Sequence, residues 1–180
     1  MKILIAYDSG NGTVKTAVER LSASLSPKFE VVAISLADST PNPADYDLIV
    51  VGASVRFGKL RAAARKYLKQ FEEILAQKPL GLFFCCGITE EQEYYAKKLF
   101  PAHLQNAAFA VSFFGGSLNL QGLGFFEKLV VRSMRSSLFE KEMDDGNYVP
   151  NLPYILPENI DRMAGMIDKL ATEIMLAQRA

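Results

Sequence analysis

The sequence predicts an α/β fold: a doubly wound, five-stranded parallel sheet with helices on both faces. Short β-favouring apolar runs alternate with longer segments in which apolar residues recur every three or four positions. The run at 47–53 is apolar throughout, which is typical of a central parallel strand covered on both faces. The chain has 180 residues, 49% of them hydrophobic, so we expect one domain over residues 1–180. Right-handed crossovers leave few topologies, and we predict the strand order 2-1-3-4-5.

Each expected strand is a short apolar run bounded by turn-forming residues. Gly10 and its neighbours interrupt the first run, Pro79 precedes the fourth, and Gly115 follows the fifth. The expected strands are Ile3–Tyr7, Glu30–Ser35, Asp47–Ala53, Leu80–Cys86 and Ala107–Phe114.

The expected helices carry their apolar residues on one face. In the second helix, for example, Leu60, Ala64 and Leu68 fall on a single stripe. The expected helices cover residues 14–25, 59–76, 90–100 and 158–177. An inserted segment at about 117–156 precedes the last helix, where a short connection is usual, and it has a helical pattern of its own.

The stretch from Asp8 to Val14 follows a strand and opens a helix. In that position backbone N–H groups and the helix dipole bind phosphate, and glycines let the main chain curve around the anion. The expected phosphate-binding residues are Ser9, Gly10, Asn11, Gly12, Thr13 and Val14. The alternative is a Gly-rich turn that binds no ligand.

Two further loops follow the third and fourth strands. In the first, an arginine and an aromatic residue between glycines suit stacking on a flat ring and pairing with its polar edge; alternatively, Phe57 fills the core. In the loop after the fourth strand, backbone groups can form hydrogen bonds with a ring. The expected ring-binding residues are Ala53, Ser54, Val55, Arg56, Phe57, Gly58, Cys86, Gly87 and Ile88.

These motifs resemble the flavodoxin-like family over essentially the whole chain. Within it, the sequence is most similar to the menaquinone-dependent protoporphyrinogen IX dehydrogenases, through Val51–Gly58, Gly115–Leu118 and the long segment before the last helix. The resemblance implies FMN as the cofactor, with its phosphate in the first loop and its isoalloxazine ring between the other two. The sequence departs from the family at Val14, where many flavodoxins have Thr, and in the loop 87–93, which is shorter than in the dehydrogenases.

The resemblance also implies an FMN-dependent oxidoreductase of heme biosynthesis, which passes electrons from a reduced tetrapyrrole to a quinone. The flavin carries that chemistry, so we expect no catalytic side chain. Basic and aromatic residues of the inserted segment suit propionates or anionic lipid headgroups, or else form an ordinary solvated helix face. They are Phe125, Phe126, Lys128, Arg132 and Arg135. The alternatives are an electron-carrying flavodoxin without its own small-molecule substrate, and an FMN-free signalling domain.

Charge and cysteine content narrow the expected partners. The 20 basic and 20 acidic side chains cancel, which argues against nucleic acid and, more weakly, against an acidic electron carrier. Cys85 and Cys86 are adjacent in a strand and are expected to be inert thiols, and His103 is expected at the surface, so we expect no metal site. We expect a cytoplasmic protein without a signal peptide, whose partner is a quinone or a redox protein. A peripheral contact with the inner face of the membrane and the oligomeric state stay open.

Overall fold

The central feature of the fold is a parallel sheet. The structure is a computed structural model that describes residues 1–10, 12–86, 92–116 and 155–177. Its parallel strands lie in the order β2-β1-β3-β5-β6. Their bounds are Lys2–Asp8 (β1), Glu30–Ser35 (β2), Leu48–Arg56 (β3), Leu80–Cys85 (β5) and Ala108–Phe113 (β6). Counted among the parallel strands alone, this is the predicted order 2-1-3-4-5, which is confirmed.

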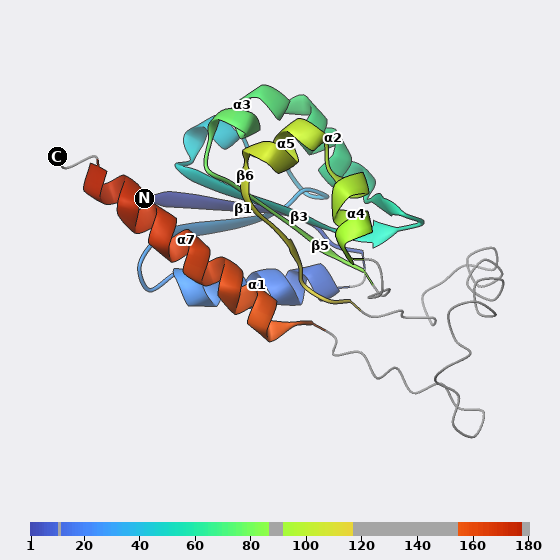
Figure 1. Ribbon diagram of the computed structural model, residues 1–180, viewed down its shortest axis with the longest axis horizontal. Coiled ribbons are helices and arrows are strands. Elements are labelled where there is room, and N and C mark those ends of the chain that lie inside the picture. The colour runs from blue at the N-terminus through green and yellow to red at the C-terminus, as the bar shows by residue number, and fades with distance from the viewer. Residues whose placement is uncertain (11, 87–91, 117–154, 178–180) are drawn as a thin grey trace, which may run out of the picture.

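Helices cover both faces of the sheet, as Figure 1 shows. On one face lie α1 (Thr13–Leu25) and α7 (Pro157–Ala177). The other face is covered by α2 (Ala62–Gln70), α3 (Glu72–Gln77), α4 (Gln92–Leu99) and α5 (Ala102–Ala107), and a short 3-10 helix, η1 (Pro43–Asp45), precedes β3. The part of the chain that the structure describes contains no helix with the length and hydropathy of a membrane span.

The predicted helix at 59–76 is wrong in two respects. Its first residues form a short strand, β4 (Lys59–Leu60), which pairs antiparallel with the end of β3. The remainder is divided into α2 and α3 at Phe71, whose backbone (φ −113°, ψ 21°) leaves the helical range. Leu60 is buried in either arrangement, so the apolar pattern cannot distinguish the first turn of a helix from a strand. Helix α5 was not predicted, because its six residues are too few to show a period.

Successive residues along the strands point to opposite faces of the sheet, and each face has its own hydrophobic core. Cys85 packs on the α1–α7 side and Cys86 on the other, and neither is in a disulfide, as expected for adjacent strand residues. Burial raises the pKa of the Cys85 thiol to about 12, so it stays protonated and inert at neutral pH. On the same side the rings of Phe83 and Phe114 stack with centroids 4.5 Å apart.

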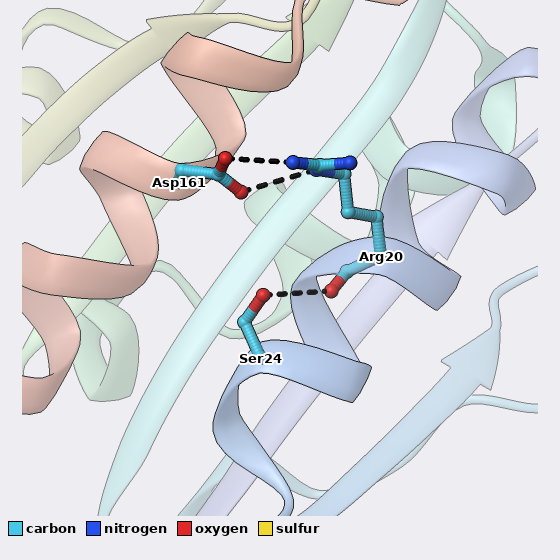
Figure 2. A network of polar contacts seen from close by, with 3 residues as sticks. All are labelled: Arg20, Ser24 and Asp161. Carbon is cyan, nitrogen blue, oxygen red and sulfur yellow. Dashed lines mark hydrogen bonds and ion pairs between the residues drawn. The ribbon is translucent and has the colours of Figure 1, made fainter.

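Helices α1 and α7 are joined by ion pairs at their exposed edges. The Arg20 guanidinium donates from Nε (3.0 Å) and Nη2 (2.7 Å) to the two carboxylate oxygens of Asp161, as Figure 2 shows. Ser24 adds a bond from its hydroxyl to the Arg20 carbonyl oxygen. Further along, Lys28 Nζ lies 2.7 Å from Asp168 Oδ2. Ion pairs therefore tie α7 both to α1 and to the segment that follows α1.

Candidate cofactor site at the carboxyl edge of the sheet

The three predicted loops leave neighbouring strands at one edge of the sheet. Asp8, at the end of β1, pairs in register with Ala53 of β3, and Ser54 pairs with Cys85 at the end of β5. Because these strands are parallel, their carboxyl ends meet at the same edge, where open α/β sheets bind their ligands. The structure thus brings together the starts of the segments 9–14, 53–58 and 86–88.

The first loop ends at the amino terminus of α1. Gly12, the N-cap residue, has a left-handed backbone (φ 91°), and no side chain caps the helix. No acidic residue lies in the first turn. A helix start of this kind presents backbone N–H groups and the positive end of the helix dipole, which together favour an anion.

Side chains of the first loop differ in what they offer. The Ser9 hydroxyl oxygen is buried and has no hydrogen-bond partner, although such groups are normally paired. A phosphate oxygen would supply its missing partner, so this loop fits an anion. Thr13 is 2% exposed, and Val14 is fully buried in the core, so the Val14 side chain offers a ligand nothing. Asn11 lies outside the described residues.

The second loop is the tip of a β-hairpin. Val55 pairs with Leu60 and Arg56 with Lys59, so Phe57 and Gly58 form a two-residue turn. Both have positive φ (51° and 70°), as a type I′ turn requires. The Phe57 ring is 61% exposed, so the interpretation that it fills the core is wrong. The Arg56 guanidinium carbon lies 5.7 Å from the Phe57 ring centroid. Ser54 and Val55 are half-buried and Ala53 is buried, so the exposed surface of this hairpin is its tip.

The third loop begins where two strand ends are in close contact. The Cys86 N–H donates to the Gly115 carbonyl oxygen at 2.9 Å. A Cβ on Gly116 would lie 2.4 Å from the Cys86 carbonyl oxygen, so only glycine fits there. Cys86 is 8% exposed, and Gly87 and Ile88 lie outside the described residues. So do the predicted substrate or membrane residues Phe125, Phe126, Lys128, Arg132 and Arg135.

Two charged residues at this edge, Asp8 and Arg61, are not among the predicted binding residues. The Asp8 carboxylate, 2% exposed, accepts a hydrogen bond from Arg61 Nε at 2.7 Å. Its other oxygen accepts from the backbone N–H groups of Ala63 (3.1 Å) and Ala64 (3.4 Å), at the start of α2. A carboxylate directly after an apolar strand is a signal that could have identified Asp8. Arg61 lies 53 residues away in the sequence, and no local pattern connects it to Asp8.

Other polar features lie away from this edge. His103 is at the surface, as predicted, where its Nε2 lies 2.8 Å from Glu72 Oε1. A cavity of about 350 Å³ opens beside the start of β2 and the end of α7. It is lined by Lys28, Phe29, Asp168, Thr172, Met175 and Leu176. Because Phe29 directly precedes β2, this cavity is at the amino edge of the sheet, opposite the three loops.

The fold and the site define a class: doubly wound α/β proteins that bind an anionic ligand beyond the carboxyl ends of parallel strands. The particular family follows from sequence comparison, because the model of the flavodoxin domain family matches residues 4–145. The chain belongs to that family, and the predicted resemblance is confirmed.

Individual proteins are similar to this chain in sequence or in fold. The chain is 25% identical over 142 residues to a protoporphyrinogen IX dehydrogenase [quinone] of Leishmania major, a match that covers 73% of this chain and 61% of that protein. Among solved structures it is similar to a Fusobacterium nucleatum flavodoxin bound to flavin mononucleotide (15% identity, TM-score 0.54, 93% and 97% of the two chains). It is also similar to the rubredoxin:oxygen oxidoreductase of Desulfovibrio gigas (16% identity, TM-score 0.52), where the match covers 76% of this chain but only 35% of that one.

Proposed function

We propose that this protein binds FMN at the carboxyl edge of its sheet and passes electrons from a reduced substrate of the porphyrinogen class to a quinone. The observation that carries FMN binding is the Ser9 hydroxyl, which is buried without a partner in the loop that leads to the uncapped start of α1. The substrate and the quinone rest on the likeness to the Leishmania major dehydrogenase, of which the match spans 61%.

Different residues of the protein bind the phosphate and the ring of the cofactor. Ser9 and the backbone N–H groups at the start of α1 hold the phosphate, since they combine hydrogen-bond donors with a favourable dipole. Residues 53–58 and 86–88 hold the ring, with Phe57 as the exposed aromatic surface and Arg56 beside it. When bound, FMN supplies the redox chemistry by taking up electrons and passing them on.

The exposed hairpin tip favours a second candidate, an electron carrier that docks on a redox protein. Phe57 is accessible to a partner protein as well as to a small molecule. Against this, the 20 basic and 20 acidic residues of the chain cancel, so it lacks the strong field that steers such docking. We therefore prefer the FMN-dependent oxidoreductase to the electron carrier. A peripheral membrane contact through the segment 117–156 stays a prediction.

Two measurements test the proposal in sequence. A titration of the purified apoprotein with FMN, followed by absorbance, is expected to give a shifted and structured flavin band at 1:1 stoichiometry. Oxidation of protoporphyrinogen with a menaquinone analogue is then expected to proceed in multiple turnovers. Failure to bind FMN would exclude both redox functions and leave the FMN-free signalling domain. Binding of FMN without turnover, combined with electron exchange with a redox protein, would establish the carrier instead.

A further inference from the structure

The Asp8–Arg61 ion pair lies at the first residue of the phosphate-binding loop. Asp8 is the last residue of β1, and Ser9 follows it directly. The carboxylate is 2% exposed and holds the Arg61 Nε at 2.7 Å, while the Arg61 side chain is 32% exposed. The arginine is therefore held by a buried partner with part of its surface still open to a ligand.

The end of the Arg61 side chain lies across Gly10, the second residue of the loop. A Cβ on Gly10 would be 2.8 Å from Arg61 Nη1. Glycine at this position is thus what leaves room for the guanidinium. The bond to Asp8 uses Nε, whereas Nη1 is the atom nearest Gly10. The planar guanidinium can bind Asp8 and a second anion with different N–H groups.

We propose that Arg61 is an FMN phosphate-binding residue, which Asp8 holds over the loop through their ion pair. This inference rests on the proposed function, because it assumes that the loop holds the phosphate of FMN. It adds to that site a positively charged side chain that comes from the start of α2 rather than from the loop itself.

The charges at the loop give a physical reason for such a residue. A phosphate monoester carries close to two negative charges at neutral pH, with a second pKa of about 6. Without Arg61, that anion would bind one residue away from the buried Asp8 carboxylate, and the two charges would repel each other. Arg61 pairs with Asp8 and adds a charge-assisted bond to the phosphate, which is stronger than a bond between neutral groups.

The test compares FMN with riboflavin, which has the same ring and ribityl chain but no phosphate. Dissociation constants of both ligands are measured by quenching of flavin fluorescence for the wild-type protein and for Arg61→Gln. We expect Arg61→Gln to raise the Kd of FMN about tenfold and to leave the Kd of riboflavin nearly unchanged. Arg65→Gln is the matched control: Arg65 is exposed one turn further along α2, and its loss removes the same charge without affecting either ligand.

A second variant tests whether Arg61 binds the phosphate directly or only neutralises the charge of Asp8. Asp8→Asn combined with Arg61→Gln removes both charges, so no buried carboxylate is left unpaired and folding is protected. Direct binding predicts that this double variant also loses about tenfold in FMN affinity but not in riboflavin affinity. Wild-type FMN affinity in the double variant would overturn the inference, as would equal losses for both ligands in Arg61→Gln. A wild-type protein that binds neither flavin would refute the proposed function itself, and the inference with it.

Discussion

The α1–α7 layer and the carboxyl edge of the sheet differ in how their side chains are packed and exposed. In the layer, α1 and α7 bury Leu21 and Ile167 completely, and ion pairs such as Arg20–Asp161 join the exposed edges of the helices. At the edge, the Ser9 hydroxyl has no partner, α1 starts without a side-chain cap, and Phe57 is 61% exposed in a backbone conformation rare for non-glycine residues.

Because of this difference, we expect the layer to determine the stability of the fold and the edge to determine FMN affinity. Buried apolar contacts in the layer contribute to the free energy of unfolding. At the edge, the unpaired Ser9 hydroxyl costs stability until a ligand satisfies it, and the positive φ of Phe57 adds local strain. Substitutions in the layer should therefore change unfolding and leave FMN affinity alone. Substitutions at the edge should change FMN affinity, whatever they do to stability.

The largest expected effect is in the layer. Ile167→Ala removes a fully buried side chain from α7 and is expected to lower the free energy of unfolding by about 2–5 kcal/mol, measured by urea denaturation of the apoprotein. Ile167→Val should cost only about 0.5–1.5 kcal/mol. A change in the FMN Kd of the folded Ile167→Val protein would break the separation between the two regions.

Gly116 lies at the edge, against Cys86, the residue that follows β5. Gly116→Ala would place a Cβ 2.4 Å from the Cys86 carbonyl oxygen, so a strand end must move. We expect a loss of about 1–3 kcal/mol in stability, together with weaker FMN binding. The control is Gly165→Ala on α7, where a Cβ meets nothing within 4 Å. It should stabilise the protein by about 0.5–1 kcal/mol and leave binding unchanged.

Phe57→Asn tests the hairpin tip. Asn tolerates positive φ and forms good type I′ turns with a following glycine, so apoprotein stability should rise by about 1 kcal/mol. Loss of the aromatic ring should weaken FMN and riboflavin binding alike, by about fivefold to tenfold. Phe57→Tyr keeps the ring and should retain the affinity. Unchanged binding in Phe57→Asn would show that Phe57 does not contact the flavin.

Ser9→Ala and Ser22→Ala form a matched pair, because both hydroxyl oxygens are buried without a partner. Each substitution removes an unsatisfied group, so thermal unfolding of the apoprotein should show equal or greater stability in both variants. Only Ser9→Ala should weaken FMN binding, by about fivefold, since Ser22 is on α1 beyond the loop. Equal FMN affinities in the two variants would mean that Ser9 does not hold the phosphate.

The smallest expected effect is at the exposed pair in the layer. Hydrogen bonding from Arg20 lowers the pKa of Asp161 below its ordinary value of 3.8. The pair therefore stabilises the fold above that value, and the contribution disappears as pH falls through the lowered pKa. Asp161→Asn should reduce the Tm slightly at pH 7 and by less at an acidic pH, where the Asp161 carboxyl is protonated. The same difference in Tm at both pH values would contradict this.

Local sequence determined the framework of this protein. The apolar runs at 3–7 and 80–85 are too short for helices and form buried strands, and the long amphipathic stretches between the strands cover the sheet as helices. Connections of this length impose right-handed crossovers, which makes the strand order predictable. Glycines after the first strand likewise placed the phosphate loop, because few other residues permit the turn at Gly12.

Only the tertiary structure decided which side chains complete the site. Leu60 fits a helix or a strand equally well, and its pairing with Val55 made the segment a hairpin, which exposed Phe57. Asp8 and Arg61 meet across 53 residues because β1 and β3 are neighbours in the sheet and α2 starts beside them. Periodicity reports which face of an element is buried, whereas pairs of polar groups depend on which elements become neighbours.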